Sequence, residues 1–520
     1  MSEGEAPGAG VERGPGWAWD AAVVGAWAML TTSLFLGSVR LNTDMGLLLS
    51  IGGRLAAGGE PYVDYLETNP PWIHLLMTVP MGLSTALGTP PHHTYHLLVA
   101  LLLAGCLWAC RAVLLRAGAP RSLAGLCNLA LVGHGAITAD AWLWGQKEHL
   151  VFLLSFPWFL VLAELDGRAS PRSTAPRRDN LLWACLGVAA AIGCQIKPHY
   201  VIVGLVYAGA LVAARRRLSL LWSPAFLGYA VGGLGYPLLF LSMSPASRAA
   251  FFDVYLPMVA PGYAAYNNPM WLILAFSLQP FLAYALAATA AWAVRERPAM
   301  VQPLVGYLVL GIVAFLVQQK GFPYHRIPLL GVSAWLAAVA VHGAARGYPK
   351  LLPAAASFGL LLPVGLFVKG AWEPPARDLL FEEIERHIQP GEPLLAIDTT
   401  VPGVFPGAVE RGHRVVNHIL PSFGILYAYA DQVPPEAGPR YHTLQDAPEV
   451  ERLLFEQLAR DLTEQQVEVV VVRTTHACWT CEGDFDTLAL LEHNGFLTGP
   501  MASFEQVAVV DEHTVFVRRD

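Results

Sequence analysis

The sequence is poor in charged side chains. Asp, Glu, Lys and Arg make up only 14% of its 520 residues, and its mean hydropathy is +0.44, whereas about 25% of a soluble globular chain is charged. The shortage is local, because apolar runs of roughly 15–25 residues follow one another from residue 17 to residue 368, and about 20 apolar residues suffice to cross a bilayer. This pattern excludes an ordinary soluble protein and predicts a chain that crosses the membrane repeatedly.

The sequence also lacks long basic patches, which argues against a nucleic-acid partner, and it has few cysteines. Two of them, Cys478 and Cys481, form a CxxC motif close to His476 in the polar C-terminal part. A single motif of this kind falls short of the four ligands of a usual zinc site, so a local disulfide is the default prediction for an oxidising compartment. The other five lie in apolar runs and are predicted to be small core residues; they are Cys106, Cys110, Cys127, Cys185 and Cys194.

The chain is predicted to divide into three parts. Residues 1–16 are rich in Gly, Glu and Pro and are expected to form a disordered cytoplasmic tail. Residues 17–370 hold the spans and a first outer loop at 40–93, and the first span is too long for a cleaved signal peptide. Residues 371–520 contain no lysine and no glycine-rich phosphate loop, and their patterns are typical of a small α/β domain. Its predicted elements are a helix at 377–387, a strand at 393–399, a helix at 448–462 and a strand at 467–473.

The arginines predict how the chain is oriented, since cytoplasmic loops carry an excess of Lys and Arg. Five arginine-bearing loops are each separated from the next by two predicted spans, so all five lie on one side, and we take that side as cytoplasmic. The N-terminus is then inside only if the short, proline-containing segment 71–88 does not cross, and we predict that it lies in the outer interface. About eleven spans result, at 17–39, 94–115, 121–139, 149–165, 180–195, 199–214, 219–242, 269–294, 299–318, 326–343 and 350–369, with the C-terminal domain outside.

Three predicted outer loops carry a lysine beside the membrane with a histidine close behind, although outer loops should be poor in basic residues. Snorkelling of each lysine to the headgroup layer is the simple explanation. Three such pairs on one face favour instead a site for an anionic phosphate, whose oxygens pair with ammonium and imidazolium donors. The pairs are Lys147 and His149 in WGQKEH, Lys197 and His199 in QIKPHY, and Lys320 and His325 in QQKGFPYHRIP, where Tyr324 precedes the histidine and Arg326 follows it.

Carboxylates gather on the same predicted face. Asp44 follows the first span closely and precedes apolar residues at helical spacing (47, 48, 51 and 55), which predicts a surface helix. Asp44 could simply cap that helix, and Asp64, Glu67 and Asn69 could be ordinary turn residues before a Pro-Pro pair. Asp140 lies before the GQKEH loop. A carboxylate opposite a phosphate site can also take a proton from an acceptor hydroxyl as the phosphate leaves, and such a single displacement inverts the anomeric centre of a sugar.

These segments resemble the GT-C superfamily of membrane glycosyltransferases. The resemblance rests on an Asp soon after the first span, on GGEPYVDYLETNPPW, and on GQKEH, KPHY and QQKGFPYH, and it covers residues 17–370. The chain is most similar to the bacterial branch akin to protein O-mannosyltransferases and lipid A aminoarabinose transferases. The resemblance implies a polyprenyl-phosphate sugar donor, catalysis on the non-cytoplasmic side, and a first-loop Asp as base or metal partner, a position that Asp44 matches. The sequence departs from the aminoarabinose-transferase pattern, because Glu67, Thr68 and Asn69 stand where a lysine precedes the Pro-Pro pair.

The family often has a second important acidic residue after the third span. Asp140 and Glu148 both fit that position, so the resemblance makes Asp44 with either of them a candidate site for a divalent metal. Some family members use a metal and others do not, and no other cofactor is expected.

The sequence therefore predicts an α-helical, polytopic glycosyltransferase of the inner cell membrane, which moves a sugar with inversion from a polyprenyl-phosphate donor to an extracytoplasmic lipid, glycan or protein. Asp44 is the predicted base. The predicted ligands of the donor phosphate are Lys197, His199, Lys320, His325 and Arg326, and further substrate-site candidates are Asp64, Glu67, Asn69, Asp140, Gln146, Lys147, Glu148, His149 and Tyr324. One alternative is a transporter or lipid flippase, which should place polar residues near the midplane and show internal repeats. The other is a non-catalytic scaffold of a polysaccharide-assembly complex.

Overall fold

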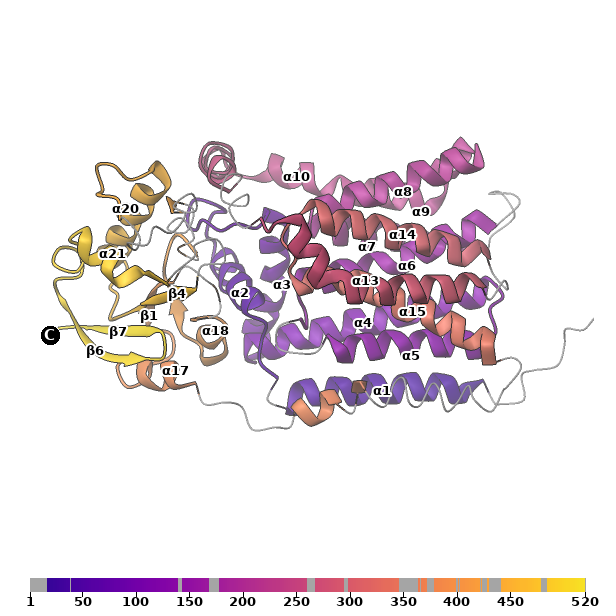
Figure 1. Ribbon diagram of the computed structural model, residues 1–520, viewed down its shortest axis with the longest axis horizontal. Coiled ribbons are helices and arrows are strands. Elements are labelled where there is room, and N and C mark those ends of the chain that lie inside the picture. Colours follow the sequence, from indigo (N-terminus) through magenta and orange to yellow (C-terminus); the bar gives the residue numbers. More distant parts are fainter. Residues whose placement is uncertain are drawn as a thin grey trace, which may run out of the picture.

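The computed structural model places a long bundle of helices beside a smaller, sheet-containing part formed by the C-terminal third of the chain (Figure 1). Helices α2 and α3 lie between the two, at the end of the bundle nearest the sheet. We call this end the sheet-side end. The structure describes residues 16–37, 39–138, 143–167, 177–259, 267–293, 298–345, 363–364, 366–371, 378–398, 401, 403–420, 422, 428–429, 441–477 and 484–519.

The bundle consists of apolar helices that run along the long axis of the molecule. Within the described residues, six helical segments are long and apolar enough to cross a membrane, and three more are apolar but shorter. The predicted span at 350–369 falls mostly outside the described residues. The helices of the bundle are α1 (Trp17–Leu36), α4 (Pro91–Arg116), α5 (Arg121–Ile137), α6 (Lys147–Gly167), α7 (Arg177–Ile196), α8 (His199–Arg215), α9 (Pro224–Gly233), α10 (Gly235–Ser242), α13 (Met270–Ala293), α14 (Pro298–Val317) and α15 (Ile327–Ala345).

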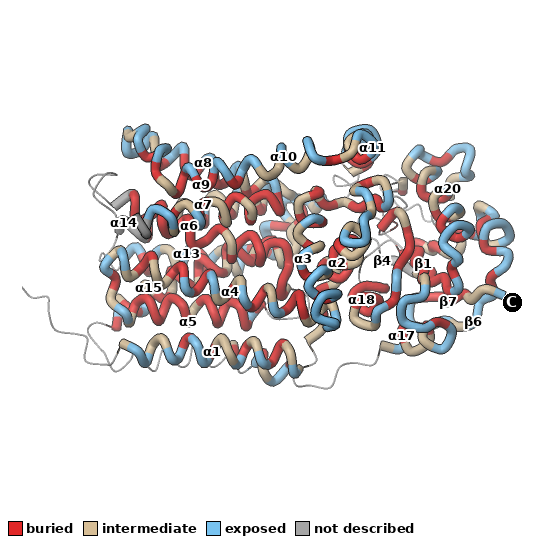
Figure 2. The backbone as a smooth tube through the Cα atoms, turned by 180° about the vertical axis from the view of Figure 1, so that it is seen from behind, coloured by how far each residue is buried: buried red, intermediate tan, exposed pale blue. Residues whose placement is uncertain are grey.

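The inner helices of the bundle are buried, and its outer surface is apolar. Helices α5 and α6 are buried along most of their length, whereas α8 and α13 are largely exposed (Figure 2). The exposed side chains of α13 include Trp271, Phe276 and Leu286, each with at least 70% of its surface accessible. Such a surface is stable against lipid. Its side chains are apolar, and the backbone polar groups along the helix are satisfied within the helix.

One predicted span is interrupted. The predicted span at 219–242, which glycine and proline interrupt in the sequence, consists of a short 3₁₀ helix, η1 (Leu218–Trp222), followed by α9 and α10, which meet at Leu234. Glycines 232, 233 and 235 surround this break, and glycine is about 1 kcal/mol less favourable than alanine within a helix. Pro224–Ser242 together is long enough to span, so the span begins at Pro224 and not at residue 219.

Helices α2 (Thr43–Ala56) and α3 (Pro71–Leu87) cover the sheet-side end of the bundle. Helix α3 exposes Leu75, Val79, Leu83 and Leu87, which recur every fourth residue and therefore form one stripe, while its other face is buried. An apolar stripe opposite a buried face is compatible with contact with lipid, and the interfacial position of 71–88 stays a prediction.

The C-terminal part contains a five-stranded sheet of order β2-β1-β3-β7-β6. Strands β1, β2 and β3 are parallel, and β7 runs antiparallel to both β3 and β6. The predicted strands at 393–399 and 467–473 correspond to β1 and β3. The predicted helices at 377–387 and 448–462 correspond to α17 and α20. Cys478 and Cys481 lie outside the described residues. The elements are α17 (Leu379–Ile384), β1 (Pro393–Ile397), α18 (Gly407–Arg411), β2 (Arg414–Val415), α20 (Glu449–Glu464), β3 (Val469–Arg473), the hairpin β4 (Thr475–Ala477) and β5 (Asp484–Asp486), α21 (Thr487–His493), β6 (Phe504–Val510) and β7 (His513–Arg518).

Candidate active site at the sheet-side end of the bundle

Asp44 lies in the first turn of α2, but it does not cap that helix. The cap is Asn42, whose Oδ1 accepts hydrogen bonds from the backbone N–H groups of Asp44 (3.0 Å) and Met45 (3.4 Å). The Oδ2 of Asp44 instead receives Gln146 Nε2 at 3.2 Å and Lys147 Nζ at 3.4 Å. Its side chain remains 25% exposed. The carboxylate is therefore paired with a lysine and still reachable by a substrate.

Lys147 links Asp44 to the end of the first loop. Besides Asp44, its Nζ donates to Asn69 Oδ1 at 2.8 Å. Asn69 is in turn held by Glu67, whose two carboxylate oxygens accept from Asn69 Nδ2 (2.6 Å) and from the Asn69 backbone N–H (2.7 Å). The spatial neighbours Asp44, Asn69 and Lys147 thus come from three separate segments of the chain.

Glu67 is completely buried and belongs to a chain of polar groups that the sequence did not reveal. Its Oε2 lies 2.9 Å from His74 Nε2, and the Nδ1 of His74 lies 3.0 Å from the hydroxyl of Tyr65. Burial alone would raise the pKa of Glu67, but the hydrogen bond and charge of His74, with the charge of Lys147, lower this pKa below its ordinary value. A histidine one turn into an otherwise apolar helix was the available signal for His74.

A second ion pair lies next to the first. Glu148, fully buried at the start of α6, pairs through Oε1 with Lys197 Nζ and faces His325 Nε2 at 3.4 Å. The Lys197 ammonium also lies 5.5 Å above the ring of Tyr324, at cation–π distance. Both Asp44 and Lys147 act electrostatically on Lys197, so the two ion pairs form one polar centre.

Lys320 completes the cationic side of this centre. It lies between α14 and the short helix η3 (Pro323–Arg326), and its Nζ donates to Asn267 Oδ1 at 2.8 Å. Burial lowers the pKa of Lys320 to about 8. His325 experiences the charges of all three site lysines and of His199. The sequence has five lysines, and the other two are Lys350 and Lys369. Three of the five lysines therefore belong to this centre.

Three of the described candidates stand apart from this centre. Asp64 is exposed and closes a turn, where its Oδ2 accepts from the Glu60 N–H at 2.6 Å, as the simple turn explanation expects. His149 is buried against Trp144, with ring centroids 5.0 Å apart. Arg326 is half-buried and acts on Tyr284 of α13. Asp140 lies outside the described residues.

The carboxylates of this centre fit a divalent metal poorly. Asp44 and Glu148 are each paired with a lysine, and an ammonium group at that distance repels a cation. Among the residues that the structure describes, no group of three or more His, Cys, Asp or Glu side chains is arranged to hold a metal ion. We therefore derive no chemical step through a metal.

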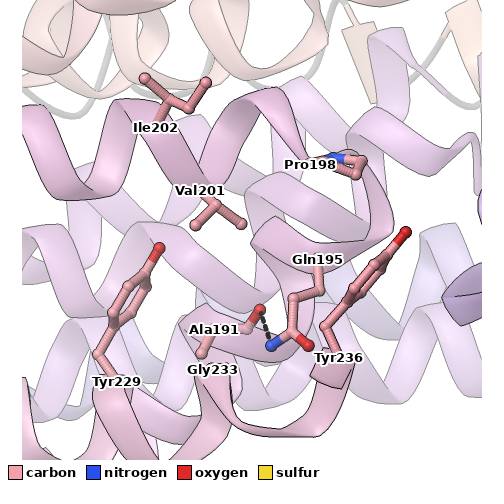
Figure 3. Close-up of a pocket in the computed structure, with 8 residues that line it drawn as sticks. All are labelled: Ala191, Gln195, Pro198, Val201, Ile202, Tyr229, Gly233 and Tyr236. Atoms are coloured by element: carbon pink, nitrogen blue, oxygen red, sulfur yellow. Dashed lines mark hydrogen bonds between the residues drawn. The ribbon is translucent and has the colours of Figure 1, made fainter. Parts of the chain in front are cut away.

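An apolar cavity of about 260 Å³ is lined by Gln195 and Pro198, which lie on either side of Lys197 in the chain (Figure 3). It lies between helices α7 and α8 on one side and α9 and α10 on the other. Its one amide, Gln195, donates inward to Ala191 O (3.0 Å) and Gly232 O (2.8 Å), which leaves the cavity wall apolar. The lining residues are Ala191, Gln195, Pro198, Val201, Ile202, Tyr229, Gly233 and Tyr236.

The whole chain is similar in structure to ArnT from Cupriavidus metallidurans, a lipid A aminoarabinose transferase. The structure of ArnT bound to undecaprenyl phosphate has a TM-score of 0.62 and 14% identity, and the match covers 96% of this chain and 98% of that one. The apo structure has a TM-score of 0.60 at the same identity, over 96% and 97% of the two chains. The chain has the fold of GT-C glycosyltransferases.

The GT-C resemblance seen in the sequence is thus confirmed at the level of the fold. No protein-family model and no curated protein sequence matches the chain. The GT-C fold and the apolar helices together make the protein a multi-pass membrane protein. At 14% identity the similarity concerns how the chain is arranged, so the chemistry must be argued from the site itself.

Proposed function

We propose that the protein transfers a sugar from a polyprenyl-phosphate carrier to a hydroxyl-bearing acceptor, with inversion, at the sheet-side end of the bundle. The observation that carries this proposal is the polar centre itself. A partly exposed carboxylate, Asp44, lies within electrostatic range of a buried lysine, Lys197, and Pro198, the next residue after that lysine, lines an apolar cavity. A lipid phosphate needs such a combination of cation and apolar cavity, and acceptor activation needs the carboxylate.

The donor phosphate fits the cationic side of the centre. Lys197 and Lys320 would donate to its oxygens through ammonium groups that have three donors each and also contact Glu148 and Asn267, respectively. The charges of both lysines act on His325. These groups would stabilise the negative charge that develops on the phosphate as the sugar leaves. The first prenyl units would lie in the cavity beside Pro198.

The acceptor fits the side of Asp44. In the proposed reaction Asp44 takes the proton of an acceptor hydroxyl, the hydroxyl oxygen bonds to the anomeric carbon, and the bond from that carbon to the phosphate oxygen breaks. The products are the glycosylated acceptor and polyprenyl phosphate. Lys147 and Gln146 hold the carboxylate in place through its Oδ2. The arginine-bearing loops at 111–121 and 215–217 support a non-cytoplasmic location for this chemistry, with the N-terminus inside.

The test compares the parent protein with Asp44→Asn and with Asp64→Asn, purified in detergent. Each is incubated with a panel of polyprenyl-phosphate sugars and an extract of membrane lipid and glycan, and the release of polyprenyl phosphate is measured. We expect turnover by the parent and by Asp64→Asn, and a loss of about 10²–10⁴-fold in Asp44→Asn, the usual contribution of a general base. Asp64 is a matched control because it belongs to the same loop and its exposed carboxylate closes a turn away from the polar centre.

Two outcomes would contradict parts of the proposal. Full turnover by Asp44→Asn would overturn the role of Asp44 and keep the transferase. No turnover with any donor, together with movement of the lipid-linked sugar across liposome membranes, would overturn the transferase in favour of a flippase.

A further inference from the structure

The N-terminal end of α2 is held by the C-terminal part of the chain. The backbone N–H of Leu41 donates to Glu410 Oε1 at 2.6 Å, one residue before the Asn42 cap. Arg40 pairs with both Glu410 (3.1 Å) and Asp378 (2.9 Å). Glu410 lies on α18 and Asp378 caps α17, so two helices of the C-terminal part meet the residues that start α2.

The opposite end of α2 is held as well. The guanidinium of Arg54, near the last residue of the helix, donates to Val415 O (2.5 Å) and Asn417 O (2.7 Å). Burial lowers the pKa of Arg54 to about 10, against the opposing charge of Asp461. The two carbonyls belong to β2 and to the segment that follows it, so this arginine ties the helix to the sheet.

Two further contacts join the first loop and α2 to the C-terminal part. The first loop pairs with the segment after β2 as a parallel bridge, in which the Leu66 N–H donates to His418 O (2.7 Å) and the Leu420 N–H donates to Leu66 O (2.9 Å). Gly46, one turn into α2, packs so closely that an added Cβ would lie 3.0 Å from the Cα of Pro406. The helix that carries Asp44 is therefore in contact with the C-terminal part along its length.

We propose that the C-terminal part is a clamp that fixes α2, and that Glu410 and Arg54 are positioning residues for Asp44. This inference rests on the function proposed above. A helix of 14 residues is marginal on its own, and its first turn carries the carboxylate. Catalysis demands that such a group be held to within a fraction of an ångström, since a shift of about 1 Å can cost about 10²-fold in rate. The bundle holds Asp44 from one side through Gln146 and Lys147, and the clamp holds its helix from the other.

The test uses the full-length protein with Glu410→Ala, Arg54→Lys and the control Arg411→Ala. Arg411 is the neighbour of Glu410 on α18, but its ion pair is with Glu385 inside the C-terminal part (2.7 Å). Three quantities are measured: kcat at saturating donor, the Kd for undecaprenyl phosphate, and backbone hydrogen exchange of residues 43–56. We expect Glu410→Ala and Arg54→Lys to lower kcat by about ten- to a hundredfold, to speed exchange in the first turn of α2, and to change Kd by less than about twofold, with Arg411→Ala near the parent.

Two more variants separate positioning from a general loss of structure. Glu410→Gln keeps an acceptor for the Leu41 N–H and should recover most of kcat. In an Asp44→Asn background, Glu410→Ala should cause no further loss, because a group that acts only through Asp44 has nothing left to position, whereas independent effects would add. Unchanged exchange of α2 and unchanged kcat in Glu410→Ala would overturn the clamp. The exchange measurement needs no reaction, so the clamp can fail or stand independently of the proposed transferase.

Discussion

The three lysines of the site differ in what holds their charge. Lys147 and Lys197 each pair with a carboxylate, Asp44 and Glu148 respectively. Lys320 donates to a neutral amide, that of Asn267, and burial lowers the pKa of Lys320 to about 8. The charge of Lys320 is therefore expected to change in an accessible pH range.

This difference predicts how donor binding depends on pH. Lys320 is charged well below pH 8 and loses its proton as the pH rises through about 8. Binding of undecaprenyl phosphate should therefore weaken, and its Kd should rise several-fold between about pH 7 and pH 9. Over this range the lipid phosphate is already fully ionised, since its second pKa is about 6. Lys320→Arg keeps the charge throughout and should flatten the profile. An equally steep profile in Lys320→Arg would assign the titration to another group.

Glu67 gives a prediction about stability. Glu67→Gln removes a buried charge that accepts from His74 and Asn69, and disrupting a buried pair of this kind costs about 3 kcal/mol or more. We expect a clearly lower midpoint of thermal unfolding in detergent, together with a loss of activity because Asn69 also orients Lys147. Asp64→Asn, a similar change at an exposed turn of the same loop, should leave the midpoint within about 1 °C. Equal midpoints of thermal unfolding for both variants would show that the charge of Glu67 does not stabilise the fold.

At the scale of elements, the close contact of α2 with α3 yields a matched pair of substitutions. A Cβ on Gly52 would lie 2.6 Å from the backbone C and O atoms of Met77 on α3, which cannot move aside. A Cβ on the adjacent Gly53 would meet only the end of the Met81 side chain, at 3.1 Å. Gly52→Ala should therefore destabilise the protein by about 1–3 kcal/mol and displace α2, whereas Gly53→Ala should be neutral or stabilise it by up to about 1 kcal/mol. Thermal unfolding and turnover of both variants check this, and a harmless Gly52→Ala would contradict the contact.

These elements also show how much of the structure can be predicted from the sequence. Apolar runs predict most of the helices, because the length needed to cross a bilayer leaves a plain signal, and the stripe on α3 follows from its spacing. The sequence shows that glycine and proline interrupt the span at 219–242, but the position of the break at Leu234 comes from the structure. Lys147 and Lys197 were singled out because charge beside a membrane is costly, and Asp44 because it closely follows the first span. The cap Asn42 and the buried His74 were missed, although an Asn before a helix and a His in an apolar helix are visible in the sequence. The contacts of Glu410 with Leu41 could not be predicted, because they join residues distant in the sequence, and no periodic pattern records such pairs.

At the scale of the whole molecule, the polar centre lies where three different environments meet. The bundle supplies Lys147, Glu148 and Lys197 from the ends of its helices, the first loop supplies Asp44, and the sheet-containing part closes against that loop (Figure 1). The cavity beside Pro198 opens between helices of the bundle rather than toward the sheet. A ligand with a charged head and an apolar tail matches this arrangement, because each of its ends finds its own environment.

This arrangement predicts that binding depends on the length of the prenyl chain. The cavity of about 260 Å³ is smaller than the roughly 300–1,000 Å³ of a complete small-molecule site, so it should hold a section of the tail. Val201→Trp on α8 would fill it, while Leu205→Trp, one turn further on an exposed surface, would not.

Each buried methylene contributes about 0.8 kcal/mol, so excluding two of them should weaken undecaprenyl phosphate binding by about tenfold or more in Val201→Trp. Dimethylallyl phosphate, whose single prenyl unit is too short to gain as much from the cavity, should be weakened less, and Leu205→Trp should bind both ligands like the parent. Titration of the two lipids in detergent measures the ratio of the effects. Equal weakening of both would mean that the substitution disturbs Lys197 and not the tail. If neither ligand binds more weakly, the prenyl tail does not occupy this cavity, because the indole of Val201→Trp would displace anything bound there.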